Sequence, residues 1–147
     1  MQSNQDKRYQ TMVVLWFSLL ASVGMYLLVA LFVAPQHANQ PQNSSSHLMI
    51  VVLTASGTFL VIVSFVVKQR ILERSVEKQD INLVQKALVV ACAMCEVSAL
   101  LGLLERFTIG NREYYWLFLL AAAGIAFHFP RRSQLEAASY MDPARLT

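Results

Sequence analysis

Four side chains in this 147-residue chain are of types that can do chemistry inside an otherwise apolar sequence: Glu96, Cys92, Cys95 and His128. Glu96 is the most informative of them. It lies within the apolar segment Leu83 to Leu104, which is long enough to cross a bilayer. A charged group at bilayer depth is costly, so an ionisable residue there indicates either proton or ion handling or a buried polar contact.

The surroundings of Glu96 leave both interpretations open. No basic residue lies within one helical turn of it on its own segment. Without a nearby cation, we expect the desolvated carboxyl group to be mostly neutral and to donate a hydrogen bond to a Ser or Thr hydroxyl or to a backbone carbonyl. Such a bond can hold two helices together, and the same group can carry a proton. Glu96 is therefore both a helix-contact residue and the candidate for proton or ion binding.

His128 and the two cysteines offer weaker chemistry. Gly124 lies one helical turn before His128, an arrangement that lets a flat macrocycle lie against a helix while imidazole ligates its metal. The alternative is an interfacial anchor, because Pro130 closes the segment just beyond this histidine. Cys92 and Cys95 form a C-x-x-C pair with no companion ligands, so we interpret them as small packing residues and predict no metal site.

The elements that must position these residues are membrane spans. The chain is 56% hydrophobic and 14% charged, with a mean hydropathy of +0.45, which is a membrane composition. No charged residue occurs between Tyr9 and Val67, a run long enough for two spans separated by the polar stretch Pro35 to His47. We predict four spans, the last of them short: about 12–34, 48–67, 83–104 and 114–129.

The predicted fold class is therefore all-α, an integral membrane four-helix bundle that forms a single membrane domain over residues 1–147, with a flexible C-terminal tail over 133–147. Small residues mark where its helices touch. Along the third span they recur at spacings of three and four, at Ala91, Cys95, Ser98 and Gly102. Further small or hydroxyl residues in the other spans suit the same purpose: Ser18, Ser22, Thr54, Gly57, Thr58, Ser64 and Ala121 to Gly124. Whether these faces meet each other or another subunit is open.

Basic residues predict the orientation. They precede the first span, lie between the second and third, and follow the fourth: Lys7, Arg8, Lys68, Arg70, Arg74, Lys78, Arg131, Arg132 and Arg145. By the positive-inside rule both termini are cytoplasmic, and we expect a bacterial inner membrane. The net charge of +3 and pI near 9.1 then reflect topology and attraction to anionic lipid, and they call for no nucleic-acid partner.

The stretch Val84 to Leu104, VQKALVVACAMCEVSALLGLL, resembles the second helix of the ATP synthase rotor subunit, the c or proteolipid family. It shares an acidic residue among small residues, followed by an alanine and a Gly-Leu pair. The resemblance implies that Glu96 matches the ion-carrying carboxylate of that family. It also implies that Lys68 to Asp80 is similar to the family's cytoplasmic loop. The likeness is confined to this part of the chain, since the preceding span has only Gly57 in place of a repeated glycine motif.

The class of function is inferred from the few residues that lie outside the spans and from the motifs that the chain lacks. No Ser/His/Asp set, nucleotide-binding loop or pair of carboxylates is visible, so we do not expect an enzyme. We predict a non-catalytic accessory or structural subunit whose partners are the lipid bilayer and other membrane-protein subunits. The alternatives are a proton- or ion-handling proteolipid-like protein that uses Glu96, and a pigment- or haem-binding helix bundle that uses His128.

Overall fold

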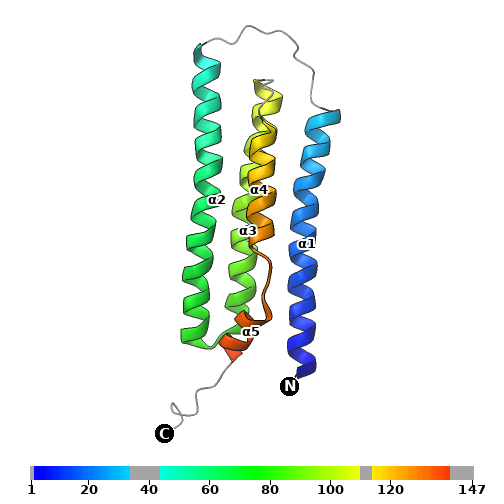
Figure 1. Cartoon of the computed structure of the whole chain (residues 1–147), viewed down its shortest axis with the longest axis vertical. Coiled ribbons are helices and arrows are strands. Elements are labelled where there is room, and N and C mark those ends of the chain that lie inside the picture. Colours follow the sequence, from blue (N-terminus) through cyan, green and yellow to red (C-terminus); the bar gives the residue numbers. More distant parts are fainter. Residues whose placement is uncertain (1, 34–43, 110–113, 140–147) are drawn as a thin grey trace.

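The computed structural model describes residues 2–33, 44–109 and 114–139. These residues form an all-α bundle, as the sequence predicts, but with five helices (Figure 1). Their bounds are α1 Gln2–Phe32, α2 Ser44–Lys78, α3 Ile81–Thr108, α4 Tyr115–Phe127 and α5 Arg132–Ser139. Three of them, α1, α2 and α3, are long and apolar enough to cross a membrane.

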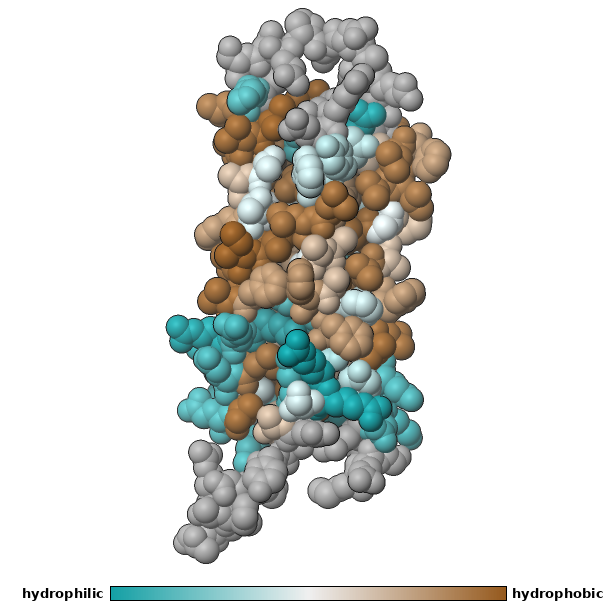
Figure 2. Space-filling model, viewed as in Figure 1, coloured by the Kyte–Doolittle hydropathy of each residue, from teal (hydrophilic) through white to brown (hydrophobic). Residues whose placement is uncertain are grey.

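The helices run roughly parallel to one long axis, with α3 and α4 between α1 and α2 (Figure 1). The start of α1, the turn between α2 and α3, and α5 all lie at one end. Figure 2 shows that hydrophilic residues gather at this end, whereas hydrophobic residues form a broad band above it. We call this end the polar end. The start of α1, the turn between α2 and α3, and α5 therefore lie on the same side of the apolar band.

Helix α4 is shorter than a full span. Its 13 residues rise about 20 Å, against the roughly 30 Å thickness of a hydrocarbon core. It ends because Pro130 restricts Phe129 to non-helical backbone and supplies no N–H group of its own. The chain then passes through residues 128–131 to reach α5 at the polar end.

The turn between α2 and α3 is tight and capped on both sides. Gln79 has a positive φ of 50°, and the N–H of Asp80 donates to the carbonyl of Ser75 at 3.0 Å. This is the pattern that commonly ends a helix. The Asp80 side chain then accepts a hydrogen bond from the N–H of Asn82 and caps the start of α3. The two helices are therefore held as an antiparallel pair that extends past the apolar band.

The prediction of a flexible tail over 133–147 is wrong for its first part. Residues 132–139 form α5, whose Leu135 and Ala138 are buried against the polar end of the bundle. Their spacing of three residues places both on one face of the short helix. This segment was missed because eight residues give too short a periodic pattern to predict a docked helix. Residues 140–147 lie outside the described part of the chain.

The boundaries of the predicted spans also shift. Helix α2 begins at Ser44, so the end of the predicted polar loop Pro35 to His47 is helical, while residues 34–43 lie outside the described part of the chain. Within the predicted third span, Lys86 is exposed. Because α3 continues to Thr108, its apolar stretch after Lys86, interrupted by Glu96, runs past the predicted end at Leu104 to Glu105.

Candidate functional site

The small residues of α3 pack inside the bundle. Ala91, Cys95 and Ser98 are fully buried, and Gly102 is buried against α4. A Cβ atom added at Gly102 would lie 3.0 Å from Leu117 Cβ and 3.3 Å from the Tyr114 carbonyl oxygen. Backbone approach at this point therefore depends on the absence of a side chain.

Two further glycines make the same kind of contact. A Cβ added at Gly57 of α2 would come within 2.9 Å of Ser98 Oγ, and one added at Gly124 of α4 would come within 2.8 Å of Cys95 Sγ. The glycines and the small residues of α3 therefore face each other across one contact of α2, α3 and α4. We call this contact, formed by Gly57, Cys95, Ser98, Gly102 and Gly124, the seam.

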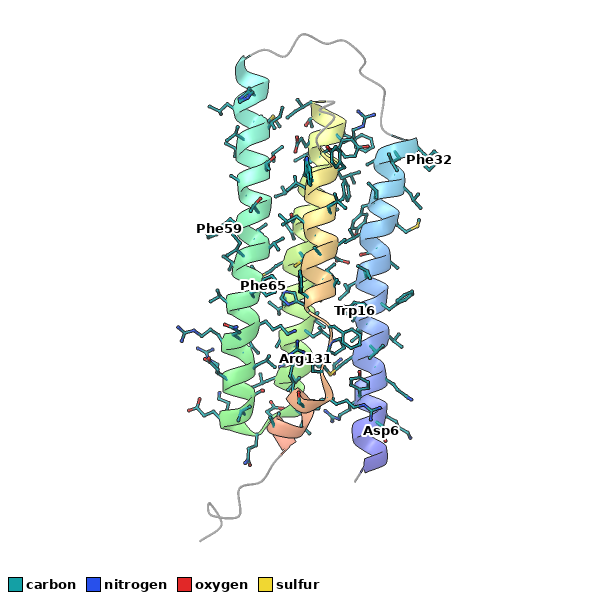
Figure 3. All side chains as sticks on the ribbon, in the orientation of Figure 1. Asp6, Trp16, Phe32, Phe59, Phe65 and Arg131 are labelled. Carbon is teal, nitrogen blue, oxygen red and sulfur yellow. The ribbon has the colours of Figure 1, made fainter. Side chains whose placement is uncertain are left out.

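His128 lies at the end of the seam that is nearer the polar end, and its side chain is buried. Its Nε2 atom is 2.9 Å from Ser64 Oγ, which also lies 3.5 Å from Cys95 Sγ. The ring of Phe65 packs on the imidazole with centroids 4.4 Å apart, and Figure 3 shows Phe65 between α2 and the lower end of α4. Sequence reasoning treated Ser64 only as a packing residue, and nothing in its spacing connected it to His128.

Donors and acceptors in this cluster can all be satisfied with a neutral imidazole. Ser64 Oγ donates to the Val61 carbonyl at 2.6 Å. Its lone pairs are then free to accept a hydrogen bond from the Nε2–H tautomer of His128. The cluster therefore ties the last turn of α4 to the middle of α2. The space that the macrocycle hypothesis requires beside Gly124 is filled by Cys95 and Val61.

Glu96 faces α1 on a different side of α3. Its Oε1 atom is in hydrogen-bond contact with Ser22 Oγ, and Ser22 Oγ lies 2.7 Å from the Leu19 carbonyl oxygen. A serine hydroxyl is one of the partners that the sequence predicts for this carboxyl group. The Ser22 hydroxyl is within reach of two acceptors, the Glu96 carboxyl oxygen and the Leu19 carbonyl, and it links α1 to α3 through the first of them.

Glu96 lies in the central part of α3, as it does in the predicted third span. Cys95 meets Ser64 of α2, and Lys68 lies one helical turn further toward the polar end. Glu96 is therefore about 6 Å from the level of the first charged residue of α2.

Helix α1 is attached mainly by side-chain contacts. Trp16 Nε1 donates to the Ile125 carbonyl of α4 at 2.7 Å, and the Trp16 ring meets Phe129 edge-on at 5.1 Å (Figure 3). At the polar end, Arg8 donates to the Asn82 side chain at 2.9 Å. Of the residues in the apolar window of α1, 11% are buried, against 44% for α3. The corresponding share for α2 is 17%, so α1 and α2 are the outer long helices of the bundle.

Lys68 is the second functional residue that sequence reasoning missed, because it was treated as part of the loop after the second span. It is 91% buried, with 9% of its surface exposed, and its Nζ donates to the carbonyl of His128 at 3.2 Å. Its position directly after an apolar run was the available signal.

The described residues contain no group of three or more His, Cys, Asp or Glu side chains placed to hold a metal ion. No family model, curated protein or solved structure matches the chain.

Proposed function

We propose that this protein is a non-catalytic accessory subunit of a larger membrane protein complex, and that it docks on its partner through the outer face of α1. The observation that carries the proposal is the contrast among the glycines. Gly57, Gly102 and Gly124 lie in close contacts within the bundle, whereas a Cβ added at Gly24 would have no neighbour within 4 Å.

The outer face of α1 has the composition of a helix-packing surface. Its exposed residues include three small ones at a spacing of three, Ser18, Ala21 and Gly24, flanked by the exposed side chains of Val14 and Leu28. Glycine within a helix costs about 1 kcal/mol relative to alanine, and contact with lipid does not repay that cost. Close approach of a second helix offsets the cost of glycine, because small residues let two helix backbones come into contact in a membrane.

The proposal includes the setting of the protein. The bundle lies in the lipid bilayer of a bacterial inner membrane with its polar end, and so both termini, in the cytoplasm. The concentration of basic residues at that end supports this orientation. The expected partners are other membrane-protein subunits, with no nucleic acid. Since nearly all described residues belong to the bundle, little of the chain remains for an independent reaction.

The test is recovery of the partner after extraction in a mild detergent. We expect Gly24→Leu to leave the bundle folded, because the added side chain meets no atom of its own chain. The amount of co-purifying partner should fall about tenfold or more, which corresponds to about 1.4 kcal/mol. Ala55→Leu is the matched control, since Ala55 is a small exposed residue on the lipid-facing side of α2.

Two results would contradict the proposal. One is equal recovery of partner with Gly24→Leu and with Ala55→Leu. The other is a native protein that leaves the membrane as a monomer with no associated chain.

A further inference from the structure

Lys68 and Arg131 bring two positive charges together at the border between the apolar band and the polar end. Lys68 extends from α2, and Arg131 belongs to the connection between α4 and α5 (Figure 3). The hydrogen bond from Lys68 reaches the start of this connection, so both basic residues belong to the junction of α2 with the end of α4. The carbonyl of His128, three residues before Arg131, accepts one hydrogen bond from Lys68 Nζ.

This arrangement has no compensating acid among the described residues. An ammonium group carries three donors, and the His128 carbonyl uses one of them. The ion pair seen in the described part of the chain joins Arg132 to Asp6 and leaves Lys68 and Arg131 aside. A nine-tenths buried ammonium group with donors left over is costly while it stays charged, and an anion that binds it offsets that cost.

The surroundings fix the depth of this pair. Trp16, whose ring packs on Phe129, lies at the same end of α4 as Lys68. Tryptophan is enriched at the level of lipid headgroups because its ring is amphipathic, and basic side chains collect there because anionic headgroups attract them. Helix α5 begins directly after Arg131 and has no acidic residue in its first turn, so its N-terminal N–H groups add positive potential.

We propose that Lys68 and Arg131 form a binding site for the phosphate group of an anionic phospholipid. The phosphate accepts hydrogen bonds from the free donors of Lys68 and from the guanidinium of Arg131, which suits phosphate geometry. The acyl chains lie along the apolar surface beside this level, where Phe65 of α2 and Phe129 after α4 are partly exposed. Bound lipid thereby joins α2 to the α4–α5 connection and holds α5 in place. The site is separate from the outer face of α1 and does not depend on the accessory role.

The experiment uses the full chain, purified in an uncharged detergent and stripped of lipid, with thermal unfolding as the measurement. Phosphatidylglycerol should raise the melting temperature by about 3 °C or more, since a ligand that binds only the folded state stabilises it. Phosphatidylcholine at the same concentration should leave it unchanged, because its headgroup has no net charge. Inorganic phosphate is the third addition, and we expect no effect from it at the same concentration.

Variants assign the effect to the site. Arg131→Gln should lose most of the gain from phosphatidylglycerol, whereas Arg70→Gln, which removes an exposed positive charge nearby on α2, should keep it. Lys68→Met should unfold at a higher temperature than the unchanged protein in lipid-free detergent, because an unpaired buried charge is removed, and it should gain nothing from lipid.

Three outcomes would overturn the proposal. If phosphatidylglycerol raises the melting temperatures of Arg131→Gln and Arg70→Gln equally, the stabilisation does not depend on Arg131 and the lipid binds to surface charge in general. A full gain from inorganic phosphate would assign the site to a free anion instead of a lipid. A melting temperature that phosphatidylglycerol does not change would show that no such site forms.

Discussion

The seam and the outer face of α1 are built from the same kinds of residue but differ in what covers them. In the seam, Gly57, Gly102 and Gly124 each have an atom of a neighbouring helix within 3.0 Å of where a Cβ would lie. On α1, Gly24 and its small neighbours Ser18 and Ala21 are exposed. Small residues in a membrane helix thus indicate a close contact, and the fold decides whether that contact is internal.

The two regions also differ in how their helices are held. The seam brings backbones together, so its stability depends on shape. Helix α1 is held by separate side-chain contacts, from Trp16 to the Ile125 carbonyl, from Ser22 to Glu96, and from Arg8 to Asn82. The seam should therefore respond to changes in volume, and the attachment of α1 to the loss of hydrogen bonds.

The largest expected effect comes from placing the same bulky side chain in both regions. Gly102→Leu should destabilise the bundle by about 3 kcal/mol, because the new side chain meets Leu117 and the Tyr114 carbonyl with no space to move into. Gly24→Leu should change stability by less than about 1 kcal/mol in either direction. Unfolding of both variants in detergent, followed by circular dichroism, measures the difference. Similar losses of stability would show that the two surfaces do not differ in packing.

A smaller effect is expected from hydroxyl groups. Ser64→Ala removes the partner of His128 Nε2 and leaves a buried polar atom unpaired, which should cost about 1–3 kcal/mol. Ser18→Ala changes an exposed hydroxyl group on α1 and should cost less than about 0.5 kcal/mol. Equilibrium unfolding of the two variants provides the comparison. If Ser64→Ala is as stable as Ser18→Ala, the contact between Ser64 and His128 does not contribute to the seam.

The smallest structural effect is expected at the contact between α1 and α3. Glu96→Gln keeps a side-chain oxygen that can accept from Ser22 and nearly the same volume, so folding and partner recovery should be unchanged within about 0.5 kcal/mol. The result separates the two interpretations of Glu96. If the complex that contains Glu96→Gln keeps its activity in cells, the contact of Glu96 with Ser22 is purely structural. Loss of activity with an intact fold would support proton handling, and a carbodiimide that labels Glu96 in the unchanged protein would strengthen that conclusion.

Much of the fold could be predicted because its signals are local. The uncharged run between Tyr9 and Val67 and the apolar segment around Glu96 are each longer than a soluble helix needs, and α1, α2 and α3 follow from them. The small residues of α3 were recognisable from their spacing alone. Helix α5 was not recognisable, because Leu135 and Ala138 acquire their role only when the polar end of the bundle is present to bury them.

The sequence by itself determined that this chain is an all-α bundle with an acid and a histidine among apolar helices, because hydropathy and residue spacing are properties of single segments. Only the tertiary structure decided which of the small residues face each other, that His128 meets Ser64, and that Glu96 meets Ser22 of α1. It also decided that Lys68 is buried and bonded to the His128 carbonyl. These features depend on the relative height and rotation of helices far apart in the chain, and no local pattern encodes either quantity.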